Sequence, residues 1–103
     1  MRRGEVWDVA VDDDGHSQKF LVVSSGDWNE GAAPQCVPVL RGRGAPEVIP
    51  YIVLTNEADP VSGAVEMGGL GPLDPAAFVE LSGMLTGATM SKVSDCLRTL
   101  YEL

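Results

Sequence analysis

The sequence predicts a mainly β fold of the α+β class, a small and partly open β-barrel of five to six strands followed by a C-terminal α-helix. Three observations predict it. Short runs rich in β-branched and aromatic residues alternate with polar turns. The 12 glycines and 7 prolines are scattered along the chain rather than gathered in a linker. Hydrophobic residues recur at helical spacing in the C-terminal stretch.

The first two strands are predicted at 5–11 and 19–25, on either side of a polar segment that contains Gly15. This pattern indicates a hairpin with a long loop, and such loops commonly carry functional residues. In the first strand we expect one set of alternate residues to face the core because it is the larger and more apolar: Trp7, Val9 and Val11, with Val6, Asp8 and Ala10 opposite. The second strand is nearly all apolar, which is typical of a central strand covered on both faces.

The rest of the predicted barrel consists of short strands joined by turns. Strands are expected at 35–40, 48–55, 62–67 and 78–85, with loops at 25–31 and 41–46 and a single helical turn that begins at Asp74. Pro50 indicates an edge position or a bulge. Together these elements form an SH3-like, partly open barrel.

The C-terminal stretch predicts an amphipathic helix capped by Thr86. Its apolar face is formed by Met90, Val93, Leu97 and Leu100, with Cys96 beside them, and its polar face by Lys92, Asp95, Arg98 and Glu102. We expect this helix to cover the sheet, since a short helix is stable only when it is packed.

The 103 residues indicate a single domain spanning 1–103. A net charge of −8 argues against non-specific binding of nucleic acid, although most of the cations fall in three places: Arg2 with Arg3, Lys19, and Arg41 with Arg43. Cys36 and Cys96 form no Cys/His cluster, so we expect two reduced core thiols and no metal or cofactor. The sequence has no signal peptide and no apolar run of membrane-spanning length, which predicts a cytoplasmic protein without a membrane partner.

Several runs, in order along nearly the whole chain, carry a resemblance to a known family. They are Arg3-Gly-Glu-Val-Trp7, 18–25, Cys36-Val-Pro-Val39, 49–54 with 59–63, and Thr89–Val93 with Leu97. In these runs the chain resembles the MazF/PemK-type toxins of bacterial toxin–antitoxin systems, and especially the mycobacterial-type members that cut tRNA.

The resemblance implies a single toxin domain that acts as a sequence-selective, metal-independent endoribonuclease on single-stranded RNA, either mRNA or tRNA. It also implies a homodimer with RNA bound across the dimer groove, and a cognate antitoxin whose disordered tail occupies that groove. The reaction needs a base for the 2′-hydroxyl proton, cations for the charge on phosphorus and an acid for the leaving 5′-oxygen.

The chain departs from the family pattern at several site positions. The family arginine that precedes a proline is replaced by Lys19, followed by Phe20, and Lys lacks the bidentate fork of Arg. Leu40 stands where the family has a catalytic threonine. Gly68-Gly69 replaces an Asp with Gln or Asn, and Ser17-Gln18 lies closest to the acidic loop residue.

Three residues are candidates for catalysis: Lys19, Arg41 and His16. Candidates for substrate binding are Gln18, Ser17, Ser24, Ser25, Arg43, Trp28 and Asn29. Each also has a purely structural interpretation. Lys19 could be a solvated strand residue, the arginines a soluble sheet edge, His16 an ordinary surface histidine, the serines strand ends, and Trp28 a dimer contact or core flap. The run Asp12–Asp14 lacks EF-hand spacing and is interpreted as a hydrated turn.

Two functional hypotheses follow. The first is an endoribonuclease toxin in which Lys19 stabilises the transition state, Arg41 or Arg43 assists, and His16 or Gln18 transfers or positions a proton. The second is a binding module that has lost catalysis and holds an antitoxin or another protein such as gyrase. The missing threonine and aspartate and the negative charge favour the second.

Overall fold

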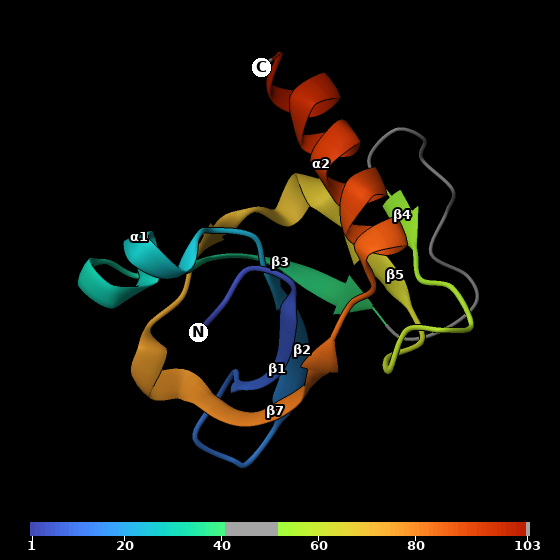
Figure 1. Ribbon diagram of the computed structural model, residues 1–103. Coiled ribbons are helices and arrows are strands. Elements are labelled where there is room, and N and C mark those ends of the chain that lie inside the picture. The colour runs from blue at the N-terminus through green and yellow to red at the C-terminus, as the bar shows by residue number, and fades with distance from the viewer. Residues whose placement is uncertain (41–51, 103) are drawn as a thin grey trace.

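The computed structural model describes residues 1–40 and 52–102 and shows one antiparallel sheet with a C-terminal helix packed on it (Figure 1). Neighbouring strands follow the order β4-β5-β3-β2-β1-β7, and β6 pairs with β3. The strands are β1 (Glu5–Ala10), β2 (Ser17–Val22), β3 (Gln35–Leu40), β4 (Ile52–Leu54), β5 (Ala64–Glu66), β6 (Gly71–Pro72) and β7 (Phe78–Met84). The helices are α1 (Gly26–Gly31) and α2 (Gly87–Tyr101), with 3₁₀ turns η1 (Met67–Gly69) and η2 (Pro75–Ala77).

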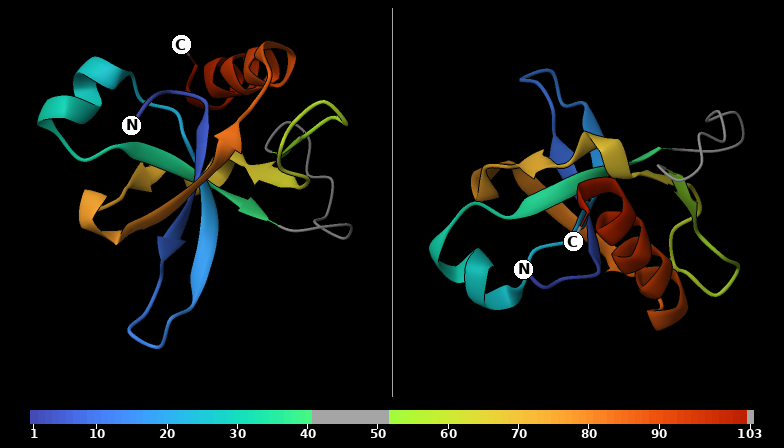
Figure 2. Two further views of the ribbon diagram at one scale, coloured as in Figure 1. Left: turned by 60° about the horizontal axis from the view of Figure 1, so that its bottom comes forward. Right: turned by 90° about the horizontal axis from the view of Figure 1, so that it is seen from above.

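The predicted fold class is confirmed, with seven strands in place of five to six. The sheet is curled, and Figure 2 shows its strands crossing one another with α2 over one end and the β1–β2 hairpin projecting at the other. Among the described residues no pairing of β4 with β7 closes the sheet into a barrel. The two-residue strand β6 was not predicted because it lies between glycine and proline turns.

Helix α2 forms as the sequence predicts. The Thr86 side chain accepts a hydrogen bond from the Thr89 N–H and caps the helix. Val93 and Cys96 are buried, and the apolar neighbours packed against the core are Met90, Leu97 and Leu100. The predicted polar face, Lys92, Asp95, Arg98 and Glu102, is exposed. Across the described parts of the chain no helix combines the length and apolar character needed to cross a membrane.

The main core lies on the face of the sheet that α2 covers. Cross-strand pairing places Val6 opposite Leu21 and Leu21 opposite Val37, and all three are fully buried. They join Met67 and Val93 in one hydrophobic cluster. Burial of such side chains contributes about 1.5–3 kcal/mol each relative to exposure.

The predicted facing of the first strand was only partly correct. Val9, from the set predicted to face the core, is buried, but the residue of this strand that enters the main hydrophobic cluster is Val6, from the opposite set. Trp7 is half-buried and packs edge-on against Phe78, whereas Val11 lies beyond the strand and is 53% exposed. The physical reason is that α2 packs on the side of Val6. In addition, the pairing of β1 with β7 shifts register on both sides of Trp7–Asp8, so simple alternation does not describe this strand.

Other local predictions had mixed outcomes. The segment predicted as a loop at 25–31 contains α1, because the Ser25 hydroxyl accepts a hydrogen bond from Trp28 N–H and starts a helical turn. The turn at Asp74 is confirmed as η2. Strand β2 is central, but only its last two residues, Leu21 and Val22, are buried. Of the predicted strand 48–55, residues 52–54 are a strand and 48–51 lie outside the described residues.

Both cysteines are buried and neither forms a disulfide, in agreement with the expected core thiols. Burial raises the pKa of the Cys36 thiol to about 12 and also raises the pKa of Cys96. Because the thiolate is the reactive form, both side chains behave as small apolar groups.

A turn before β5 holds the start of α2 through Asp59. One carboxylate oxygen accepts a hydrogen bond from the Thr86 N–H at 2.7 Å. The other accepts from the Asn56 N–H at 2.8 Å and from the Thr89 hydroxyl at 2.5 Å. Partial burial opposes ionisation, but these donors outweigh it and hold the pKa of Asp59 below its ordinary value of 3.8.

Replacing Asp59 should therefore weaken the packing of α2. We expect Asp59→Asn to lower the free energy of unfolding by about 1–2 kcal/mol at pH 7, measured by urea denaturation. Because the folded pKa is depressed, the contribution is complete above pH 3.8 and is lost as the pH falls below it, so the two proteins should converge there. Asp95→Asn, in the exposed 3.5 Å pair with Arg98, is the control and should change stability by less than about 0.5 kcal/mol. Equal stability of wild type and Asp59→Asn at pH 7 would contradict this role.

Candidate functional site

A row of cross-strand partners links the core to a polar hollow on the same face of the sheet. Asp8 in β1 lies opposite Lys19 in β2 and Glu80 in β7, and Lys19 lies opposite Val39 in β3. The row continues through Val65 and Val53, which are buried. Residues directly opposite each other in an antiparallel sheet project on the same face. The charged end of this row therefore extends the core face to the point where the hydrophobic cover ends.

Lys19 occupies the centre of the charged end. Its ammonium group donates to Asp8 Oδ1 at 2.7 Å and to Ser82 Oγ at 2.8 Å. The Ser82 hydroxyl in turn donates to Asp8 Oδ1 at 3.3 Å. The side chains of Lys19 and Asp8 are 28% and 26% exposed, so the pair is partly screened from water. An ion pair in this setting is more rigid than one on an open surface.

Two adjoining depressions meet at this pair, with volumes of about 380 and 490 Å³, and they share Asp8, Lys19 and Val39. One extends toward Ser17, Gln18 and Leu40. The other extends toward β7 and the turn before β5 and is lined by Glu80, Ser82, Pro60, Val61 and Ser62. We call the two together the Lys19 hollow.

One glycine shapes the wall of the Lys19 hollow. Gly83 has φ +148°, and a Cβ atom built on it would lie 2.6 Å from Pro60 Cγ. Only glycine allows the proline turn to approach β7 so closely. This contact brings Pro60, Val61 and Ser62 next to the strand that carries Ser82.

The predicted site residues divide between two places. Ser17 and Gln18, which precede Lys19 on β2, line the same hollow as Lys19. The other group, Ser24, Ser25, Trp28 and Asn29, lies at and around α1 and does not line the hollow. Arg41 and Arg43 lie outside the described residues.

The residues around α1 have structural partners. Ser24 Oγ accepts from Gln35 N–H at 2.9 Å and is hydrogen-bonded to Asn29 Oδ1, while the Asn29 amide donates to the carbonyls of Ser24 and Met1. Ser25 caps α1. The Trp28 indole N–H donates to the Ala33 carbonyl at 2.9 Å, and its ring is half exposed. These contacts join the end of β2 to α1 and to the N-terminal segment.

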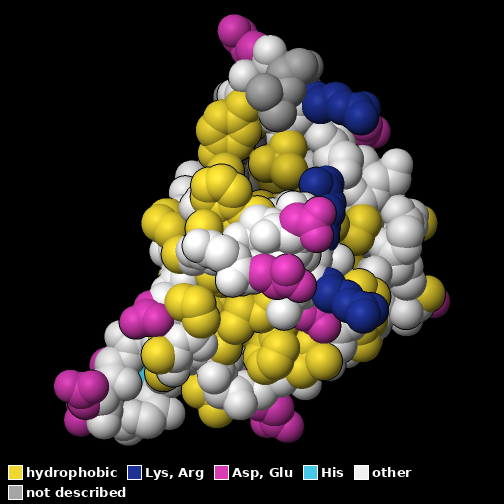
Figure 3. Space-filling model, turned by 60° about the vertical axis from the view of Figure 1, so that its left-hand side comes forward, with side chains coloured by type: hydrophobic (Ala, Val, Ile, Leu, Met, Phe, Trp, Pro, Cys, Tyr) yellow, Lys and Arg dark blue, Asp and Glu magenta, His cyan; other side chains and the backbone are white. Residues whose placement is uncertain are grey.

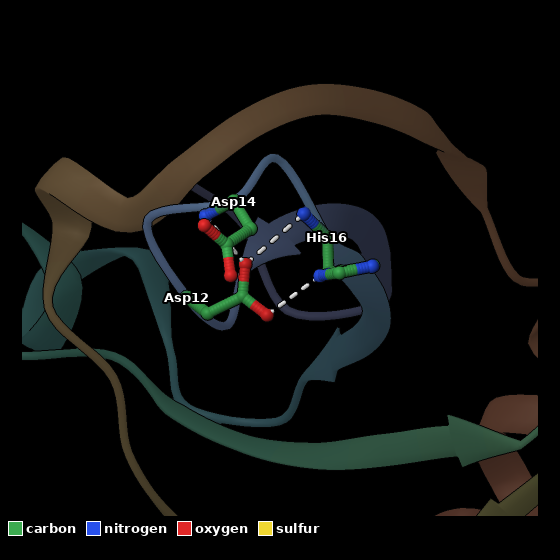
Figure 4. A group of neighbouring side chains, drawn as sticks. All are labelled: Asp12, Asp14 and His16. Carbon is green, nitrogen blue, oxygen red and sulfur yellow. Dashed lines mark hydrogen bonds and ion pairs between the residues drawn. The ribbon is translucent and has the colours of Figure 1, made fainter.

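His16 lies in the β1–β2 loop with Asp12 and Asp14 (Figure 4). Its Nδ1 is 2.7 Å from Asp12 Oδ2, and its side chain is 72% exposed. Desolvation raises the pKa of the Asp12 carboxyl, but the hydrogen bonds that this carboxylate makes with His16 and Asp14 outweigh that effect. They hold the pKa of Asp12 below its ordinary value. One ligand atom from each of the three residues lies within 4.8 Å of the others, a spacing that could hold a cation. Exposed acidic turns of this kind are common without one, and the group does not line the Lys19 hollow.

Sequence reasoning missed Asp8 and Ser82. Asp8 was placed on the solvent side of its strand because the opposite set was more apolar, and Ser82 sits in a strand without a motif. A usable signal was present, since a hairpin with the observed loop sets Asp8 opposite Lys19 and makes them a cross-strand ion pair.

No family model matches the sequence, and no curated protein matches it. Solved structures do match over nearly the full length. An endoribonuclease from mycobacterial species, in complex with its cognate antitoxin, superposes with a TM-score of 0.85 at 27% identity, covering 100% of this chain and 96% of that chain. A second mycobacterial endoribonuclease gives 0.86 at 26% identity, covering 100% and 92%. MazF in a MazE–MazF crystal from Deinococcus radiodurans gives 0.78 at 22%, covering 98% and 94%. The resemblance to MazF-type toxins is therefore confirmed in the structure, and the chain has a MazF-like fold.

The structural role of Ser24 gives a test that separates it from a substrate-binding role. We expect Ser24→Ala to lower the free energy of unfolding by about 1–2 kcal/mol, because Gln35 N–H loses its acceptor in a half-buried site. Thermal denaturation measures the effect, with Ser17→Ala at an exposed position of the hollow as a control that should unfold like wild type. An unchanged melting temperature for Ser24→Ala would argue against the structural role.

Proposed function

We propose that this chain is the toxin of a type II toxin–antitoxin system and a sequence-selective, metal-independent endoribonuclease that cleaves single-stranded RNA, either mRNA or tRNA. Its likeness over the full length to solved endoribonucleases supports the proposal, at 26–27% identity for the mycobacterial proteins. The observation that carries it is the placement of Lys19, the residue at the family's arginine position, in a hollow large enough for a nucleotide phosphate.

In the proposed reaction Lys19 stabilises the negative charge that develops on the five-coordinate phosphorus. The 2′-hydroxyl gives its proton to a base, and its oxygen forms a bond to phosphorus as the bond to the 5′-oxygen breaks. The 5′-oxygen takes up a proton, and the products are a 2′,3′-cyclic phosphate and a 5′-hydroxyl. Gln18 and Ser17 lie beside Lys19 and would hold the ribose or a phosphoryl oxygen. His16, in the adjoining hairpin loop, would transfer a proton only if the loop moved toward the hollow. Arg41 and Arg43 would add cations from the segment that follows β3.

We also propose that the protein acts as a homodimer with an antitoxin partner. Strand β7 is an edge of the sheet, and its outward apolar side chains Val79, Leu81 and Met84 are 65%, 46% and 50% exposed. Figure 3 shows hydrophobic side chains gathered in a broad band on one face, with Lys and Arg along one side of it. An unpaired edge with this composition favours pairing with another chain. The structures similar to this chain include toxins crystallised with their antitoxins.

A second candidate function is a binding module without catalysis, which would hold an antitoxin or another protein target. The charge of the Lys19 hollow favours it. Among the described residues that line the hollow, Asp8 and Glu80 oppose the single cation Lys19, so the net charge is negative. Such a surface attracts a basic protein segment more than a phosphate. The two candidates differ in whether the protein cleaves RNA.

Lys19→Ala should strongly slow cleavage under the first proposal. We expect its rate on a mixed single-stranded RNA substrate, in buffer with EDTA, to fall about 100- to 1,000-fold, because a transition-state cation is lost. Lys19→Arg should keep part of the rate. The control is Lys92→Ala, at an exposed lysine on α2, which should cleave like wild type. The products should carry a cyclic phosphate or the 3′-phosphate formed from it. If wild type neither cleaves RNA nor arrests growth on expression, the binding module is the correct function.

A substitution on the exposed face of β7 tests the dimer. Val79→Glu should convert a dimer to a monomer, because a charge in the centre of an apolar contact loses its hydration. Light scattering after size exclusion measures the mass. Val11→Glu, at a similarly exposed valine in the hairpin loop, should leave the dimer intact. A monomeric wild type, or a Val79→Glu dimer, would contradict the assignment of this edge.

A further inference from the structure

The Lys19 ammonium is held by side chains from two other strands. Asp8 comes from β1 and Ser82 from β7, and both are within 2.8 Å of Lys19 Nζ. The Ser82 hydroxyl also donates to Asp8, which closes a three-membered ring of hydrogen bonds. Since β7, β1 and β2 are adjacent in the sheet, the backbone fixes the positions of all three residues. We call this ring the Lys19 clamp.

We propose that Asp8 and Ser82 are positioning residues that orient Lys19 for the scissile phosphate, an inference that rests on the proposed nuclease function. An ammonium group has three N–H donors. The clamp takes two of them, which leaves one for a phosphoryl oxygen of an RNA bound in the hollow. The direction of that donor is set before the substrate arrives.

The clamp supplies what a lone lysine lacks. A lysine side chain is flexible and carries a point charge, whereas an arginine can hold a phosphate with a rigid, two-pronged contact. Fixing the ammonium in the folded protein removes its rotational freedom in advance, so that freedom is not lost when RNA binds. Asp8 and Ser82 thereby compensate for the replacement of arginine by Lys19.

The opposite role for the same contacts would be inhibition, with Asp8 holding Lys19 away from phosphate. The two roles predict changes of opposite sign when Asp8 loses its charge. A substitution of Glu80 distinguishes both roles from a general effect of removing negative charge from the hollow. It lies opposite Asp8 and lines the hollow, and none of the hydrogen bonds and ion pairs in the described chain joins it to Lys19.

The experiment measures kcat and KM for cleavage of a defined single-stranded RNA by Asp8→Asn, Ser82→Ala, Glu80→Gln, Lys19→Ala and the double variant Asp8→Asn/Lys19→Ala. We expect kcat of Asp8→Asn to fall about 10- to 100-fold without a rise in KM, because the ammonium loses its orientation while the hollow becomes less negative. Ser82→Ala should lower kcat in the same direction by a smaller factor. Glu80→Gln should lower KM and keep kcat. The double variant should be no slower than Lys19→Ala, since the positioning residues act through Lys19.

Several results would overturn the inference. A higher kcat in Asp8→Asn would show that the clamp inhibits. Equal effects of Asp8→Asn and Glu80→Gln would show a charge effect alone, and additive losses in the double variant would show that Asp8 acts independently of Lys19. Ser82→Ala, which keeps the ion pair, preserves the test if Asp8→Asn fails to fold. Cleavage that depends on Lys19 but not on Asp8 or Ser82 would refute the clamp and leave the nuclease proposal standing. Absence of cleavage by wild type would refute both.

Discussion

The alternation of side chains in β1, β2 and β3 constrains both the core and the Lys19 hollow. Val6, Leu21 and Val37 form a buried row on one face of the sheet. Asp8, Lys19 and Val39 form the next row on that face, two residues along each strand. The core therefore fixes the register that brings Asp8 and Lys19 together. A slip of one residue in this hairpin would turn Leu21 and Lys19 together to the opposite face of the sheet, which would remove Leu21 from the core and separate Lys19 from Asp8.

The placement of a lysine and an aspartate at the end of a hydrophobic face has electrostatic consequences. Neither group is fully desolvated, so the pair can form without the cost of a buried charge. The Asp8 carboxylate also offsets the charge of Lys19, and Glu80 adds a second carboxylate to the same hollow. Among the described residues that line the hollow the net charge is therefore negative, and a phosphate bound there would need a direct hydrogen bond from the Lys19 ammonium.

Much of the fold could be predicted from the sequence because the residues that specify a helix, cap or turn lie within that element. The spacing of Val93 and Leu97, the cap at Thr86 and the turn at Asp74 each determine their own element. The facing of β1 could not be derived in this way, because it depends on which side α2 packs and on the register shifts against β7. The site shows the same division. Ser17, Gln18 and Lys19 follow one another in the chain and were predicted together, while Asp8 and Ser82 join them only through pairing of three strands. The sequence could not show that polar atoms of Ser24 and Asn29 hydrogen-bond the backbone around α1, and a role for these two residues in substrate binding stays a prediction.

The proposed function depends on a contact between the Lys19 ammonium and a phosphate of single-stranded RNA. The most direct measurement is NMR of the lysine side-chain ammonium groups, titrated with a single-stranded RNA oligonucleotide that is made non-cleavable by 2′-deoxy substitution. We expect the Lys19 signal to shift in a saturable manner while the signal of Lys92, on the exposed face of α2, does not. An unchanged Lys19 signal at saturating oligonucleotide would contradict it.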